Sequence, residues 1–222
     1  MDSRDTFNKL LRDGKDEVII MGSMVEEALA RSVEALKQRD LNLGHQIIAD
    51  DTKINEKRFE IEKKCIELIA AQQPVTSELN IIVAILNIIN ELERIGDYAT
   101  GIAKIVIMIG DEPPLKPLID IPRMRDITVE MIHNSLKSFI ENDTKRAIQV
   151  IGMDEVVDNI YDQIFRELLT FMMTDPKTIN RATRLIWVAH NIERAADRAT
   201  NICERVVYMV TGKMEEIGAS KY

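Results

Sequence analysis

Two stretches of the chain carry the same acidic pattern at an interval of 100 residues. The first, NELERIGDYATGIAK, contains Glu93 and Asp97, and the second, HNIERAADRATNICE, contains Glu193 and Asp197. Each residue of an α-helix advances by about 100°, so residues four apart lie about 40° from one another on one face. In both stretches a Glu and an Asp therefore project together from one side of a helix. Carboxylates in this arrangement can share a cation, or each can pair with an arginine.

Two more acids lie where the apolar pattern of a preceding helix requires aliphatic residues. Asp51 and Asp154 interrupt these apolar seams, and Asn55 and Asp158 follow one turn later. A lone carboxylate there would cost several kcal/mol, so it must be hydrogen bonded, paired with a cation or bound to a metal. If the two helices are antiparallel neighbours, the acidic pairs converge. The predicted metal ligands are Asp51, Asn55, Glu93 and Asp97 in the first half and Asp154, Asp158, Glu193 and Asp197 in the second.

The residue types also indicate which ions and which alternatives to consider. Oxygen ligands favour Mg²⁺, Mn²⁺ or iron over structural Zn²⁺, although the pattern does not identify the ion. The alternative to a metal is pairing with arginines, because Arg94 and Arg194 directly follow the two glutamates. Glu130-x-x-His133 matches one element of the ferritin-like di-iron bundles, but that fold needs the element twice. We therefore expect His133 to be a surface or hydrogen-bonded residue.

Composition and charge exclude several classes of protein. The formal net charge is −8, from 37 acidic and 29 basic residues, which disfavours binding to nucleic acid. No apolar run of about 18 residues and no signal peptide is present, so we expect a soluble cytoplasmic protein. We find no P-loop, nucleophile elbow or Cys-x-x-Cys motif. Cys65 and Cys203 lie in amphipathic patterns and are expected to be buried, reduced thiols.

The elements that must position the carboxylates are helices. Aromatic residues make up only 5% of the chain, and it contains 9 Gly and 6 Pro, which is typical of an all-α protein. Asp40, Asp143 and Asp175 are candidate N-caps, with Pro176 suited to the first helical position. The predicted helices cover roughly residues 5–38, 41–72, 77–109, 122–141, 144–173 and 176–212.

The six helices form two copies of a three-helix unit. The segment GDEPPLKPLIDIP, at 110–122, holds four of the six prolines and is expected to separate the copies. Asp40 recurs as Asp143 with a spacing of 103, and Glu93 recurs as Glu193. A tandem duplication is the simplest explanation. We therefore predict a first three-helix bundle over 1–110, a proline-rich linker over 111–122 and a second bundle over 123–222.

Taken together, these features closely resemble the PhoU family, the regulators of phosphate uptake and phosphate signalling in bacteria and archaea. The resemblance covers nearly all 222 residues. It rests on CIELIAAQQPVTSELNIIVAILNIINELERIGDYATGIA, on the linker DEPPLKP, and on DEVVDNIYDQIFRELLTFMMTDPKTINRATRLIWVAHNIERAADRATNICERVVYMVTG. The family fold implied is two similar three-helix bundles related by a pseudo-twofold axis.

The resemblance also implies a function. Some members carry multinuclear clusters of iron or other transition metals on the repeated acidic motifs, which implicates the eight positions named above. The implied role is negative regulation of phosphate uptake and of the phosphate-starvation response by a non-enzymatic adaptor. Its partners would be the ATPase subunit of a phosphate transporter (PstB-like) and a sensor histidine kinase (PhoR-like). We further expect a homodimer that reaches the membrane only through partner proteins.

The chain departs from the family motif GDHAxNIAE at several positions. Tyr98 replaces the His in the first copy and Arg198 replaces it in the second. The first copy also has Gly101 and Lys104 in place of the Asn and Glu, and Asn55 in place of an acid. By charge count, the second site is expected to bind metal more tightly. Two alternatives to a regulator remain: a metalloenzyme that activates water or O₂, and a metal-storage protein.

Overall fold

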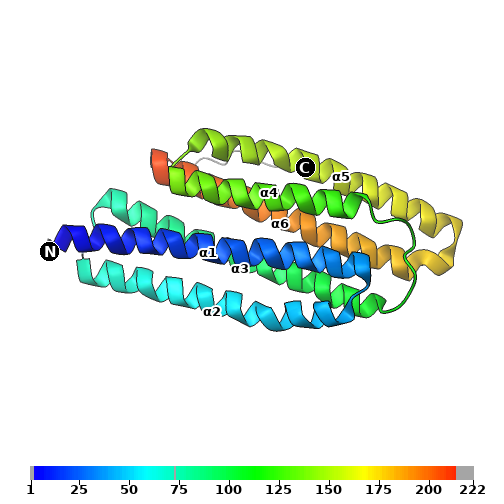
Figure 1. Ribbon diagram of the computed structural model, residues 1–222. Helices are drawn as coiled ribbons and strands as arrows, with labels where there is room; N and C mark the ends of the chain where they lie inside the picture. Colours follow the sequence, from blue (N-terminus) through cyan, green and yellow to red (C-terminus); the bar gives the residue numbers. More distant parts are fainter. Residues whose placement is uncertain (1–2, 73, 214–222) are drawn as a thin grey trace.

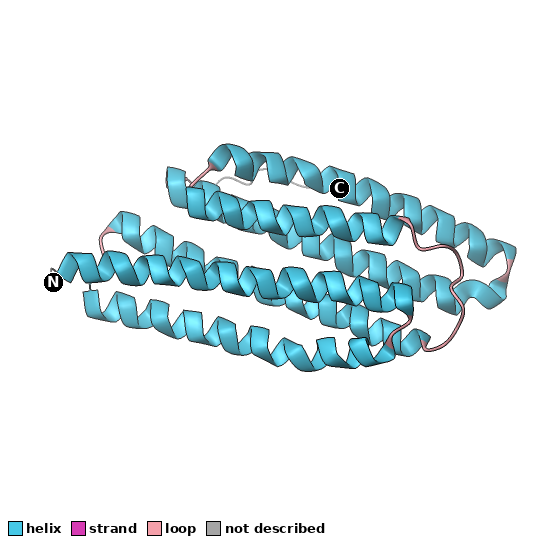
Figure 2. Ribbon diagram, viewed as in Figure 1, coloured by secondary structure: helices cyan, strands magenta, loops and turns pink. Residues whose placement is uncertain are grey.

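The described part of the chain folds into six long helices and one short 3₁₀ turn, so the all-α class predicted from the composition is confirmed. The computed structural model describes residues 3–72 and 74–213, and this part of the chain contains no strand (Figure 2). The elements are α1 (Ser3–Gln38), α2 (Leu41–Gln72), α3 (Thr76–Ile109), α4 (Asp120–Glu141), α5 (Thr144–Thr174), the 3₁₀ helix η1 (Pro176–Thr178) and α6 (Ile179–Thr211). None of these helices is long and apolar enough to cross a membrane.

The predicted N-caps account for where the helices begin. Asp40 Oδ1 accepts a hydrogen bond from the Leu43 amide at 2.9 Å, and Asp143 Oδ1 accepts one from the Arg146 amide at 3.1 Å. The two copies therefore start their second helices with the same cap. Asp175 also caps a helix, but that helix is the 3₁₀ turn η1, and α6 begins only at Ile179, later than predicted.

The proline-rich linker is anchored to the second bundle. Its end lies earlier than predicted, because α4 begins at Asp120. Pro122 falls in the first turn, where its missing N–H group is tolerated. Lys116 is buried within the linker and pairs with Glu167 on α5, while its ammonium lies 3.6 Å from Asp120. These contacts hold the linker against α5.

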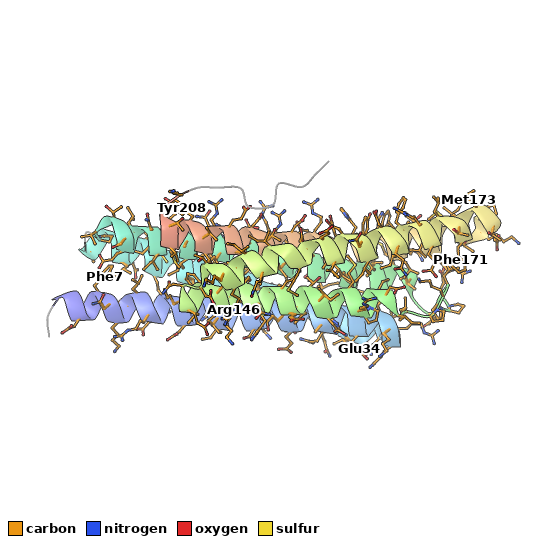
Figure 3. All side chains as sticks on the ribbon, turned by 90° about the horizontal axis from the view of Figure 1, so that it is seen from above. Phe7, Glu34, Arg146, Phe171, Met173 and Tyr208 are labelled. Atoms are coloured by element: carbon orange, nitrogen blue, oxygen red, sulfur yellow. The ribbon has the colours of Figure 1, made fainter. Side chains whose placement is uncertain are left out.

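The two bundles pack side by side through their first and third helices. Helices α1 and α4 lie in one layer, and α3 and α6 lie behind them (Figures 1 and 3). Helices α2 and α5 are at opposite edges (Figure 1), and within the described residues they contact only their own bundle. The faces of α3 and α6 are therefore central to the molecule, whereas α2 and α5 expose long outer surfaces.

Contacts between α3 and α6 follow the duplication. The helices run antiparallel, and Asn201 donates a hydrogen bond to Glu91 at 3.2 Å. The position equivalent to Glu91 in the second copy is Asn191, and the position equivalent to Asn201 in the first copy is Gly101. These two residues also meet, because a Cβ on Gly101 would lie 2.8 Å from Asn191 Oδ1. The same crossing is thus built twice, as the pseudo-twofold axis requires.

The predicted apolar seams form the core. On α3 and α6 these positions are buried along most of each helix, and each fully buried aliphatic side chain contributes about 1.5–3 kcal/mol. They are Ile85, Ile88, Leu92, Ile95, Ala99, Ile102 and Val106 on α3, and Leu185, Val188, Ile192, Ala195, Ala199, Ile202, Val206 and Met209 on α6. Cys65 and Cys203 are buried free thiols, as expected.

Candidate metal centres

The four acids predicted in the second half lie together between α5 and α6. Burial raises the pKa of Asp154 to about 7, and repulsion from Asp158 and Asp197 adds to this. Burial also raises the pKa of Glu193 to about 7, with Asp197 and Asp158 acting in the same direction. Because each carboxylate affects the others, the antiparallel packing of α5 on α6 has made one acidic group from two helical pairs.

Two oxygens of this group are buried without a hydrogen bond. These are Asp154 Oδ1 and Glu193 Oε2. His190 Nδ1 lies 3.2 Å from Glu193 Oε2, but without the alignment of a hydrogen bond. An unsatisfied buried polar atom costs about 1–3 kcal/mol, and a cation would satisfy both oxygens. The donor types and the unsatisfied oxygens of the second group therefore suit a metal ion, although the side chains are not yet gathered around one point.

His190 is a possible ligand that sequence reasoning did not include. It lies three residues before Glu193, so the two side chains share a helix face. Burial lowers the pKa of His190, which favours the neutral imidazole that metals bind. The ring of Tyr161 lies 6.0 Å away, centroid to centroid. The i, i+3 spacing from a predicted ligand was the signal that could have identified it.

The acids of the first half also converge, but protein donors already satisfy part of this group. Asn55 Nδ2 donates to Asp51 Oδ2 at 3.1 Å, and the Thr100 hydroxyl also bonds to Asp51. Burial, followed by repulsion from Asp97, raises the pKa of both Asp51 and Glu93. The first group therefore leaves fewer free oxygens than the second.

Nearby cations act on both groups, and in the second group Arg198 and Arg194 act to lower the pKa of Asp197. Lys104 on α3 acts to lower the pKa of Asp51, and Arg58 acts to lower that of Glu93. Arg58 itself pairs with Glu62 at 3.2 Å. A metal ion would have to compete with these positive charges. The prediction that the second site binds more tightly stays a prediction.

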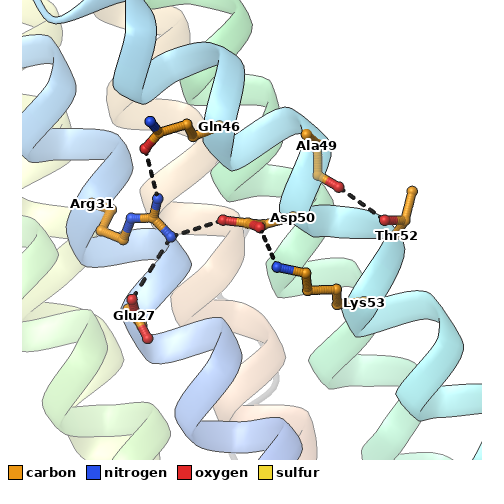
Figure 4. A network of polar contacts seen from close by, with 7 residues as sticks. All are labelled: Glu27, Arg31, Gln46, Ala49, Asp50, Thr52 and Lys53. Carbon is orange, nitrogen blue, oxygen red and sulfur yellow. Dashed lines mark hydrogen bonds and ion pairs between the residues drawn. The ribbon is translucent and has the colours of Figure 1, made fainter.

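Asp50, next to Asp51, has a different role. It bonds to Arg31 on α1 at 3.0 Å and to Lys53 at 2.7 Å, as Figure 4 shows. Arg31 also reaches Gln46 at 3.5 Å. These bonds hold the pKa of Asp50 below its usual value. Asp50 therefore joins α1 to α2, and only Asp51 turns toward the carboxylates of α3.

The groups are not arranged as finished metal sites. Among residues 3–72 and 74–213, no three His, Cys, Asp or Glu side chains are close enough to hold one ion. Carboxylates on facing helices would therefore have to rotate toward a bound ion. His133 is not part of either group: it is 66% exposed and lies 3.5 Å from Glu26 of α1, as a surface residue would.

The arginines beside the predicted ligands do not neutralise them by direct contact. Arg194 Nε donates to the Tyr98 hydroxyl at 3.1 Å, and its guanidinium lies 5.5 Å from the centre of the Tyr98 ring. Arg198 donates to Glu91 at 3.3 Å. Arg94 forms no ion pair with any described residue. Two of the departures from the family motif, Tyr98 and Arg198, thus belong to contacts between the bundles.

Known proteins match this chain over both three-helix bundles. The family model described as "PhoU domain" matches residues 18–106 and 121–206. The "Phosphate-specific transport system accessory protein PhoU homolog" of Aquifex aeolicus is 40% identical over 93% of each chain. The protein of the same name from Clostridium acetobutylicum is 36% identical and covers 97% of this chain and 99% of its own.

Solved structures agree with these sequence matches. PhoU from Pseudomonas aeruginosa superimposes with a TM-score of 0.88 at 33% identity, over 93% of this chain and all of its own. The phosphate transport system regulatory protein PhoU from Streptococcus pneumoniae also gives 0.88, at 28% identity, over 95% of this chain and 99% of its own. The duplicated three-helix bundles, the paired carboxylates and these relatives lead to one conclusion: the chain belongs to the PhoU family.

Proposed function

We propose that this protein is a non-enzymatic accessory regulator of phosphate transport. It represses phosphate uptake and the phosphate-starvation response when phosphate is plentiful, acting in the cytoplasm as an adaptor. The partners are the ATPase subunit of a phosphate ABC transporter and a sensor histidine kinase, and any membrane contact is through them. This proposal is supported by the names of the relatives, which describe accessory and regulatory proteins.

The observation that carries an adaptor role is the outer surface of α5. Phe165, Leu169 and Met173 follow one another at intervals of four and are 41%, 42% and 78% exposed. They form an apolar stripe on a helix that contacts only its own bundle among the described residues. Exposed apolar stripes of this kind are typical of protein interaction surfaces. A second copy in a homodimer could use the same kind of surface.

Co-purification tests the adaptor role. In phosphate-rich medium, the protein should retain a phosphate-transporter ATPase or a sensor kinase, and Leu169→Glu should abolish that retention. Thr170→Glu is the matched control, because Thr170 is exposed next to the stripe but points about 100° away from Leu169. Light scattering would measure the dimer. No retained partner, or equal loss with both variants, would contradict the adaptor role.

We also propose that each half binds metal through its carboxylates. Asp51, Glu93 and Asp97, with Asn55, form the first centre. Asp154, Asp158, Glu193 and Asp197 form the second, where the unsatisfied Asp154 and Glu193 oxygens support it. A bound iron, Mn²⁺, Mg²⁺ or Zn²⁺ ion would supply positive charge that holds the facing helices together.

Calorimetric titration of the metal-free protein with Mn²⁺ tests this part. Asp51→Ala should remove the first binding event and Asp154→Ala the second, and Asp50→Ala should remove neither. Phosphatase or oxidase activity with added Mn²⁺ or Fe²⁺ would instead favour a metalloenzyme. Heat release that is unchanged by both ligand substitutions would contradict the assigned centres.

A further inference from the structure

Arg194 lies between two ligands of the second centre in the sequence. It directly follows Glu193 and precedes Asp197 by three residues, and the i, i+3 spacing puts the Asp197 carboxylate within its reach on the same helix. A guanidinium among these carboxylates would compete directly with a metal ion. In the structure, Arg194 instead crosses to α3, where its Nε donates to the Tyr98 hydroxyl at 3.1 Å. The guanidinium also lies 5.5 Å from the centre of the Tyr98 ring.

Arg198, on the other side of Asp197, is held in the same way. Its Nη1 donates to Glu91 Oε2 at 3.3 Å, and Asn201 donates to the same oxygen at 3.2 Å. Both arginines that flank Asp197 therefore have their hydrogen-bond partners on the other bundle. The carboxylates of the second centre are left without a bonded arginine among the described residues.

The first half lacks the equivalent of this arrangement. A shift by 100 relates Arg194 to Arg94 and Tyr98 to Arg198, so the equivalent crossing would bring two arginines together. Like charges repel, and Arg94 is exposed without an ion pair to any described residue. At the position where the family has His, the first copy has Tyr98 and the second has Arg198. Arg194 therefore faces a tyrosine, whereas Arg94 has no tyrosine at the equivalent place.

We propose that Tyr98 is a positioning residue for the second metal centre. By bonding Arg194, it keeps that guanidinium from forming an ion pair with Asp197, although in sequence Tyr98 adjoins Asp97 of the first centre. This inference rests on the metal binding proposed above. It makes the second centre depend on the packing of α3 against α6, because separating the bundles would release Arg194 onto the carboxylates.

Mn²⁺ titration of the full chain tests the inference. Each centre is measured alone, in a background where Asp51→Ala or Asp154→Ala has removed the other. Tyr98→Phe should weaken the second centre by roughly two- to fivefold, the size of an exposed ion pair, and leave the first centre unchanged. Adding Arg194→Gln to Tyr98→Phe should restore the affinity. Tyr208→Phe, on the same helix as Arg194, is the matched control and should change neither centre.

Rescue by the double variant separates positioning from general damage to the fold. Equal affinity in wild type and Tyr98→Phe, or no rescue by Arg194→Gln, would overturn the inference while leaving the metal centres intact. Absence of Mn²⁺ binding by the wild type would overturn the proposed centres and this inference together. A metal-independent readout is the ¹H–¹⁵N NMR signal of Arg194 Nε–H, which should be protected from solvent exchange only while Tyr98 keeps its hydroxyl. A signal that is equally protected in Tyr98→Phe would also overturn the inference.

Discussion

Gly101 of α3 and Asn191 of α6 meet where the two bundles cross, with Asn191 Oδ1 2.8 Å from the place of a Cβ on residue 101. A Cβ does not approach another heavy atom this closely, so any side chain at position 101 would force the Asn191 side chain to move. Gly101 is a departure from the family motif that looked like a loss in the sequence. In the structure it makes room for the Asn191 side chain of the other bundle.

Gly101→Ala should therefore destabilise the protein. The added methyl would push Asn191 away or separate α3 from α6, which costs about 1–3 kcal/mol for overpacking. Gly152→Ala is the control, because nothing lies within 4 Å of a Cβ there. It should stabilise the protein by roughly 0.5–1 kcal/mol through the higher helix propensity of Ala. Urea unfolding measures both, and equal effects of the two substitutions would refute this role of Gly101.

Removing the repeated N-caps should cost similar amounts in the two halves. Asp40→Ala and Asp143→Ala each delete a side-chain bond to an amide three residues later, at 2.9 and 3.1 Å. Each loss is expected to be about 1 kcal/mol, and the double variant should show the sum because the sites are separate. Thermal unfolding followed by circular dichroism is the measurement. Stability unaffected by either change would argue against the caps.

The metal-free protein should become less stable as the pH rises from 5 to 8. The pKa values of Asp154 and Glu193 are about 7 in the folded chain, against ordinary values of about 4. Between these limits the folded state holds protons that the unfolded state has released, so a rise in pH favours unfolding. We expect a loss on the order of 1–2 kcal/mol across this range.

Asp154→Asn is the variant that checks this pH dependence. It should flatten the curve and make the protein more stable than wild type at pH 8 with EDTA present, because one buried charge is gone. Saturating Mn²⁺ should reverse the order, since only wild type keeps the full set of ligands. Urea titrations at pH 5, 6, 7 and 8 give the curves. Wild type that gains stability over this range would show that other groups dominate.

The two thiols should be unreactive in the folded protein. Burial raises the pKa of Cys65 to about 11 and that of Cys203 to about 12, and the thiolate is the reactive form. At pH 8, a disulfide reagent such as dithiobis(nitrobenzoic acid) should label neither at an appreciable rate. In denaturant it should label both. Rapid labelling of the native protein would mean that α2 or α6 opens locally.

The sequence alone determined the features that depend on local rules. Helix periodicity predicted the seams of α3 and α6, and side-chain caps predicted the starts of α2 and α5. The same periodicity predicted that Asp51 and Asp154 would lie on the apolar seams of their own helices. These predictions depend only on residues within a few turns of one helix, so the order of residues contains the information.

Only the tertiary structure decided which residues meet across helices. It paired Arg194 with Tyr98 and Arg198 with Glu91, although each arginine lies next to a carboxylate in sequence. It also placed Lys116 against Glu167, so the linker is packed rather than free. A long side chain can reach several partners from one Cα position, and the choice depends on what the opposing helix presents at that level. The packing of α3 on α6 sets which residues of the two helices lie at the same level, and no single segment of the chain specifies this packing.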